Sequence, residues 1–255
     1  MSFQLFPSST KSTSTPDLEI SPAPPSAPAT HTTSPYVTGS SVLGLRCVDG
    51  VVLSSDTLAS YGSMARFQTI TRLHQVAPGT VIGAGGEYSD LQQILRVLEQ
   101  DEIEQYCCDD GHGHGSRDLH QMLTRVMYGR RNKSDPLWNN VVVGGWDAGK
   151  PFLGLVDLYG SHFESEMVAT GFGLHLGLPL LRKAYREDMT VVEGRKVLEE
   201  IMTVLFYRDC RTINRIQIAT VTKDGVEISD PFMLDTMWEH SRFVKGARAG
   251  DDSTW

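Results

Sequence analysis

Hydroxyl side chains gather in one short stretch of the chain, and a carboxylate follows them. Thr38, Ser40 and Ser41 precede an apolar run, and the turn at Asp49-Gly50 leads into a second run that ends at Asp56. A hydroxyl becomes a nucleophile when a neighbouring base activates it. The stretch therefore raises the hypothesis of nucleophilic catalysis. The simpler interpretation, that these hydroxyls only begin a strand, remains open on composition.

Residues 109–114 read DDGHGH and form a second candidate site. Imidazoles and carboxylates close in sequence are typical ligands of Zn²⁺ or Ni²⁺. The segment is rich in glycine and has no second pair of ligands nearby, which favours a solvated loop between two helices. We therefore expect neither a metal nor a cofactor.

Two further motifs argue against other chemistries. Residues 83–87 (GAGGE) resemble a phosphate-binding loop, but Tyr88 stands in place of the third glycine of GxGxxG, so a strand-to-helix turn is favoured. The sequence has no GxSxG, which disfavours an α/β-hydrolase nucleophile.

The elements that would position these residues follow from hydrophobic periodicity. Strands are predicted at Ser41–Cys47, Val51–Ser55, Thr69–Val76, Val81–Ala84, Val141–Trp146, Pro151–Asp157, His162–Met167, Ile216–Val221 and Val226–Ile228. Helices are predicted at Ser116–Tyr128 and Leu174–Arg186, and after the capping boxes Ser89/Gln92 and Thr190/Glu193. Strands joined by hairpins form antiparallel sheets, and helices in pairs do not supply single βαβ crossovers. We predict an α+β fold with two facing sheets covered by helix pairs.

Composition narrows the class of protein. The chain has 255 residues, a formal net charge of −8 and a pI of about 5.5, which disfavours nucleic acid or an anionic membrane as a partner. The apolar runs are shorter than the roughly 20 residues that span a bilayer. The four cysteines lack CxxC spacing, so reduced thiols in the cytoplasm or nucleus are expected.

Three segments are predicted. Residues 1–37 are rich in Ser, Thr and Pro, as in a disordered or removable leader. Residues 38–235 form the globular domain. Residues 236–255 carry Trp238, Phe243 and Trp255, which suggests docking on a partner, although a frayed terminus is the alternative.

From Thr38 onward the chain resembles the β-type subunits of the 20S proteasome, and among them the β7 (β type-4) subfamily. The resemblance is carried by VTGSSVLGLRCVDGVVLSSDTLASYGSMARF, by DGHGHGSRDLHQMLTRVMYGRRNKSDPLWNNVVVGGWD and by FYRDCRTINRIQIATVTKDGVEI. It implies the four-layer αββα sandwich of N-terminal-nucleophile hydrolases. In active members a leader is cut after a glycine, and the freed α-amine of the next residue is the base for its own hydroxyl.

The resemblance also assigns site positions. The nucleophile position falls on Ser40, and the accompanying polar positions fall on Asp56, Asp209 and Thr212. Arg72 stands where active subunits have a lysine, and a guanidinium does not release a proton at physiological pH.

Phe172 stands where active subunits have a serine that assists the base, and a phenyl ring makes no hydrogen bond of that kind. In the β7 type the leader is trimmed upstream, here near Thr32 or Thr33, which leaves the Ser40 nitrogen in a peptide bond. The site positions are therefore expected to be vestigial.

The resemblance thus implies a non-catalytic structural β subunit of the 20S core particle. Such a subunit supports ring assembly and ATP- and ubiquitin-dependent protein degradation in the cytoplasm and nucleus. Its partners are the other α and β subunits, in heteroheptameric rings stacked four high. The alternative is an active peptidase subunit that uses Ser40, and a third hypothesis is a free-standing binding protein.

Overall fold

Two antiparallel sheets form the centre of this computed structural model, which describes residues 34–108, 111 and 113–239. In the larger sheet the strand order is β10-β9-β8-β7-β1-β4-β5, and β6 pairs with β7. Its strands are β1 (Val37–Gly39), β4 (Ala59–Tyr61), β5 (Met64–Phe67), β6 (Leu73–Ala77), β7 (Thr80–Glu87), β8 (Asn139–Asp147), β9 (Lys150–Val156) and β10 (His162–Glu164).

The smaller sheet has the order β11-β2-β3-β12-β13, and β14 pairs with β12. Its strands are β2 (Val42–Arg46), β3 (Gly50–Asp56), β11 (Met167–Ala169), β12 (Arg215–Thr222), β13 (Gly225–Ile228) and β14 (Phe232–Met233). The hairpin predicted at Asp49-Gly50 joins β2 to β3, with Arg46 opposite Val51.

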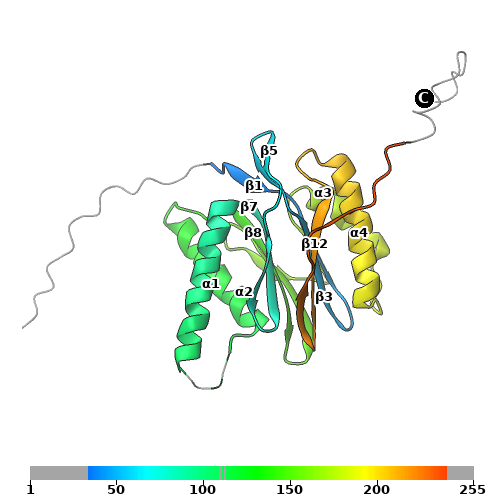
Figure 1. The fold of residues 1–255 in the computed structure, drawn as a ribbon. Helices are drawn as coiled ribbons and strands as arrows, with labels where there is room; N and C mark the ends of the chain where they lie inside the picture. The colour runs from blue at the N-terminus through cyan, green and yellow to red at the C-terminus, as the bar shows by residue number, and fades with distance from the viewer. Residues whose placement is uncertain (1–33, 109–110, 112, 240–255) are drawn as a thin grey trace, which may run out of the picture. The chain divides into compact units, whose positions relative to one another are not determined.

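Four helices cover the outer faces of the two sheets in the described part of the chain. The helices α1 (Tyr88–Cys108) and α2 (Ser116–Asn132) pack on the larger sheet, and α3 (Gly173–Ala184) and α4 (Val191–Arg208) pack on the smaller one. Figure 1 shows these helix pairs on opposite sides of the facing strands. The predicted α+β sandwich with four αββα layers is confirmed.

The layers are held together by three apolar clusters, one between the sheets and one under each helix pair. Fully burying an aliphatic side chain contributes about 1.5–3 kcal/mol, so these clusters stabilise the strands that carry the site. The cluster between the sheets consists of Val42, Val51, Leu53, Leu73, Val81, Val142, Leu153, Leu155, Val168, Ala219 and Val221.

Local sequence signals explain the start of α4. The Thr190 hydroxyl accepts a hydrogen bond from the Glu193 N–H at 3.4 Å, and the Glu193 carboxylate accepts one from the Thr190 N–H at 3.0 Å. This is the predicted capping box, which satisfies donors that a helix start leaves unpaired. The Asp49 carboxylate accepts a further hydrogen bond from the Val191 N–H at 2.8 Å.

Two local predictions are wrong. The strand predicted at His162–Met167 is divided, because β10 ends at Glu164 in the larger sheet and β11 begins at Met167 in the smaller one. The chain crosses between the sheets here, where the Ser165 N–H donates to a β9 carbonyl and the Glu166 carbonyl accepts from β2. Ser89 is not an N-cap either, because α1 begins at Tyr88 and the Ser89 hydroxyl donates to the Glu87 carboxylate at 3.1 Å.

Candidate functional site

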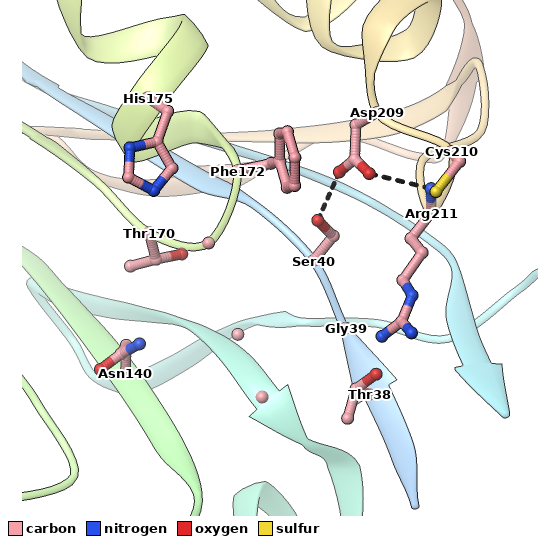
Figure 2. A pocket seen from close by; sticks show the side chains of 13 residues that line it. Thr38, Gly39, Ser40, Asn140, Thr170, Phe172, His175, Asp209, Cys210 and Arg211 are labelled. Atoms are coloured by element: carbon pink, nitrogen blue, oxygen red, sulfur yellow. Dashed lines mark hydrogen bonds between the residues drawn. The ribbon is translucent and has the colours of Figure 1, made fainter. Parts of the chain in front are cut away.

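Ser40 lies at the corner between β1 and β2, where the chain leaves the larger sheet and enters the smaller one. It lines a cavity of about 530 Å³ together with residues of β7 and of the turns before α3 and after α4. Figure 2 shows the Ser40 hydroxyl pointing toward the Asp209 carboxylate, with Phe172 beside them. The topology therefore places the predicted nucleophile position at an accessible site.

Asp209 caps the C-terminal end of α4 and holds the turn that follows. Its Oδ2 accepts the Ser40 hydroxyl at 2.6 Å and the Thr212 hydroxyl at 2.9 Å, and its Oδ1 accepts the Arg211 N–H at 2.9 Å. The structure thus brings together three of the predicted residues, although 169 positions separate Ser40 from Asp209. Asp209 orders the corner through these bonds.

Arg72 is the centre of a second, fully buried group. Its side chain is 1% exposed, and its guanidinium forms an ion pair with the Asp56 carboxylate. The Asp56 backbone carbonyl accepts a further hydrogen bond from Nε at 3.1 Å. The Ile213 N–H donates to the other Asp56 oxygen at 3.3 Å. The predicted positions Asp56 and Arg72 therefore form a pair in the core, beneath the Ser40 corner.

The remaining donors of Arg72 bind backbone carbonyls at that corner. The carbonyl of Ser40 accepts at 3.0 Å, that of Ser41 at 3.1 Å and that of Ala84 at 3.4 Å. A planar guanidinium offers five N–H donors spread around its rim, whereas an ammonium offers three from a single nitrogen. Arg72 therefore ties β3, β7 and the Ser40 corner together.

The charge state of the Asp56 carboxyl depends on two opposing effects. Burial raises the pKa of Asp56, while the Arg72 guanidinium and the Ile213 N–H lower it. The Asp56 anion is thus matched to a cation that stays protonated at any physiological pH. The Arg72 guanidinium holds Asp56 in place but does not itself relay a proton.

The backbone before Ser40 is part of the larger sheet. β1 pairs with β4 on one side and with β7 on the other, with Thr38 opposite both Ser60 and Glu87. In this chain the Ser40 nitrogen is an amide bonded to Gly39, and an amide nitrogen does not accept a proton. In the uncut chain, Ser40 therefore has no α-amine that could act as a base.

The other hydroxyls singled out in the sequence have different positions. Ser41 is buried, and its hydroxyl accepts the Gly173 N–H at the start of α3 at 2.8 Å, so it has a structural role. Thr38 lines the cavity from β1. Phe172 is 52% exposed, and its ring contacts that of His175 edge-on. Sequence reasoning missed Thr170, whose hydroxyl accepts the Val42 N–H at 2.9 Å.

The comparisons with known proteins match this architecture. The proteasome subunit family matches residues 36–221. The chain belongs to the proteasome subunit family. It is 44% identical over 225 residues to proteasome subunit beta type-4 of Xenopus laevis, covering 88% of this chain and 93% of that protein.

Other relatives are also β-type proteasome subunits. Proteasome subunit beta type-4 of Arabidopsis thaliana is 45% identical over 225 residues, which cover 88% of this chain and 91% of that protein. Proteasome subunit beta type-7 of Saccharomyces cerevisiae is 35% identical over 233 residues, covering 86% of this chain and 87% of that protein. The predicted resemblance to β-type proteasome subunits of the β7 (β type-4) kind is confirmed.

Among the remaining sequence candidates of this proteasome subunit, Trp238 does not line the Ser40 cavity. Trp238 packs edge-on against Phe206 and Tyr207 of α4 and is 67% exposed. Phe243 and Trp255 lie outside the described residues, as do Asp109, Asp110 and His112 of the metal candidate. Within the described ranges, no set of three metal-ligating side chains comes together, and no helix is long and apolar enough to span a membrane.

Residues 83–87 belong to β7, which continues directly into α1. Gly86 has a φ of +97°, and a Cβ there would lie 2.0 Å from the Trp138 carbonyl oxygen. The glycine is required by this close approach. In the proteasome subunit, the sequence GAGGE is therefore the end of strand β7, which leads into α1 without a separate turn, and the expected strand-to-helix transition lies between Glu87 and Tyr88.

Proposed function

We propose that this chain is a non-catalytic structural subunit of the 20S proteasome core. It supports ring assembly, and through the complex it supports ATP- and ubiquitin-dependent protein degradation in the cytoplasm and nucleus. Its partners are the neighbouring α and β subunits of the four-ring stack. The observation that carries the proposal is the arrangement of Arg72, whose donors are engaged with Asp56 and with the carbonyls of Ser40, Ser41 and Ala84.

Two further observations support this proposal. Phe172 lines the cavity where active relatives are expected to have a serine, and its ring neither donates a proton nor accepts one. The strand that ends at Gly39 is paired on both edges, which favours retention of the residues before Ser40 and hence of an acylated Ser40 nitrogen. A serine hydroxyl without an adjacent base is a weak nucleophile at neutral pH.

The mature N-terminus decides between this function and its rival. We expect the subunit isolated from assembled particles to retain residues upstream of Ser40, which its intact mass would show. The subunit should also resist covalent inhibitors that need a free α-amine beside the nucleophile. A mass that begins at Ser40, together with labelling of its hydroxyl, would falsify the non-catalytic assignment.

The rival function is an active peptidase subunit with Ser40 as nucleophile. It is favoured by the open cavity at the Ser40 hydroxyl and by its hydrogen bond to Asp209. Under this hypothesis Asp56, Arg72, Asp209 and Thr212 would be working groups, whereas under the leading proposal they are vestigial positions kept by the fold.

Residues 236–255 are proposed to dock on a partner subunit through aromatic side chains. Trp238, near the start of this extension, is exposed, and the other two proposed contacts are Phe243 and Trp255. Deleting residues 236–255 should hinder the joining of half-particles, measured by native gel and by the fraction of full-size particles. A variant with Lys245→Ala keeps all three aromatics and should assemble normally. Normal assembly of the truncated chain would contradict the proposed role.

A further inference from the structure

The strand β1 extends beyond the part of β7 that could pair with it. The register places Thr38 opposite Glu87 and Gly39 opposite Gly86. After Glu87 the chain enters α1 at Tyr88, so β7 presents no further strand residue to Val37 or to the residue before it. An extended segment at this position needs another hydrogen-bond acceptor on that side.

The side chain of Glu87 supplies that acceptor. Its Oε2 accepts the N–H of Val37 at 3.0 Å and also the N–H of Tyr36. Hydrogen bonds to an ionised acceptor are stronger than those between neutral groups. One carboxylate oxygen thus accepts hydrogen bonds from two consecutive backbone N–H groups at the point where β7 ends.

Glu87 is itself held in place before it binds these groups. Its side chain is 6% exposed, and its Oε1 accepts the Ser89 hydroxyl at 3.1 Å. Its backbone N–H donates to the Trp138 carbonyl at 2.9 Å, and its carbonyl accepts the Asn139 side-chain amide at 2.8 Å. The carboxylate is therefore a rigid anchor.

The opposite edge of the same segment is held by β4. Val37 pairs with Tyr61 and Thr38 with Ser60, and the Tyr36 ring stacks on Tyr61 with 6.4 Å between centroids. Ser34 and Pro35, immediately upstream, are exposed. Among the residues described from Ser34 onward, the hydrogen bonds and ring contacts of this segment with the domain begin at Tyr36.

We propose that Glu87 is a positioning residue that determines where proteolytic removal of the N-terminal segment stops. Proteases cleave backbone that can leave its hydrogen bonds, so residues 36–39 resist cleavage while the two Glu87 contacts hold them. The inference deepens the proposed function, because residues that stay attached keep the Ser40 nitrogen in a peptide bond.

The test is limited digestion of the folded full-length chain with proteinase K, followed by intact mass and N-terminal sequencing. The wild-type core should retain Tyr36 to Gly39. In Glu87→Ala, loss of these residues should accelerate on the order of ten-fold or more, because each hydrogen bond to a charged group changes an opening equilibrium by about that factor. The product should then begin at or beyond Ser40.

Two variants separate the anchor from a general loss of stability. Glu87→Gln keeps an acceptor oxygen without the charge, so its cleavage should accelerate only a few-fold. Ser89→Ala leaves both N–H contacts in place and should digest like the wild type. Thermal unfolding of each variant, followed by circular dichroism, identifies global destabilisation. If Glu87→Ala does not fold, the comparison of Glu87→Gln with the wild type decides the question.

The inference is overturned if Glu87→Ala, or in its absence Glu87→Gln, gives the wild-type product at the wild-type rate. It is also overturned if the wild-type core is cut between Val37 and Gly39. The proposed function fails by a different result, namely a subunit in assembled particles that begins at Ser40 and whose hydroxyl is labelled. That measurement is made on assembled particles and does not involve proteinase K.

Discussion

Replacing Arg72 with methionine isolates the contribution of the buried ion pair. The substitution keeps the apolar stem but removes the guanidinium from Asp56 and from the carbonyls of Ser40, Ser41 and Ala84. Breaking a buried pair by removing one partner costs about 3–5 kcal/mol, because the other charge stays buried without compensation. With a urea m-value of about 2–3 kcal/mol/M, the unfolding midpoint should fall by roughly 1–2 M. Tryptophan fluorescence of the full-length chain measures this shift.

The loss of stability in Arg72→Met should increase as the pH rises. Burial already raises the pKa of Asp56 against the opposing effect of Arg72, so without the guanidinium that pKa rises further. A carboxyl whose folded pKa exceeds its unfolded pKa favours the folded state at low pH, and this contribution is lost as the pH rises through the folded pKa. The variant should therefore lose more stability at pH 8 than at pH 5, relative to the wild type.

Two companion variants test whether the unpaired Asp56 charge causes the loss of stability. Adding Asp56→Asn to Arg72→Met removes the stranded charge and should recover part of the lost stability. Arg72→Lys keeps a charge but has one donor centre for five acceptors, so its stability should lie between those of the wild type and the methionine variant. An unchanged midpoint in Arg72→Met, or a penalty that is independent of pH and unaffected by Asp56→Asn, would refute the account.

Three other predictions concern single residues. Burial and two nearby carboxylates raise the pKa of Cys47 to about 12. At pH 8, iodoacetamide should therefore label the exposed cysteines of the isolated chain and spare Cys47 until urea unfolds it. The stability contributed by the neutral Cys47 thiol should be lost only as the pH rises above the unfolded pKa of about 9. Burial lowers the pKa of His120, so the free energy of unfolding should fall as the pH drops below about 6.5, and it should fall less in His120→Gln. Urea titrations at pH 7.5 and 5.5 measure this change. An equal change in the wild type and in His120→Gln would contradict the prediction. Gly86→Ala should lower the free energy of unfolding by at least about 2–3 kcal/mol, because of the positive φ and the clash with the Trp138 carbonyl. Gly62→Ala, at a φ of +59° with open space around it, should lower it by about 1 kcal/mol. Thermal unfolding of the two variants measures the difference.

The sequence predicts the layers of this fold because each sheet and helix buries a periodic apolar face. Leu198, Ile201, Met202 and Leu205 recur at helical spacing, and all of them are buried under α4. The same signal cannot identify the crossing at residues 165–166, because the apolar pattern there is compatible with one continuous strand. Residue types near Ser89 similarly match a capping box, although the helix already begins at Tyr88.

The candidate site depends on contacts that periodicity does not predict. Ser40 and Asp209 are 169 positions apart, and only the family resemblance assigned both to one site. Composition alone would place Arg72 on the surface, since arginine is rarely buried without a partner. Its burial follows from Asp56 and from the ring of carbonyls around it, which tertiary structure alone brings together. The hydroxyl of Ser41 was an equally good nucleophile candidate by sequence, but it accepts the Gly173 N–H.

The groups that resemble a catalytic site also determine the local structure, so their arrangement has a role in folding whether or not the site reacts. Gly39 passes over the Arg72 side chain so closely that a Cβ would lie 2.5 Å from the Arg72 Cδ, and the guanidinium binds the next carbonyl, that of Ser40. Asp209 orders the turn after α4 through Arg211 and Thr212 whether or not Ser40 ever reacts. Losing any of these residues would expose or strand a buried polar partner, at a cost comparable to a large share of a domain's 5–15 kcal/mol of stability. Folding alone therefore suffices to retain the arrangement, and its presence is not by itself evidence of catalysis.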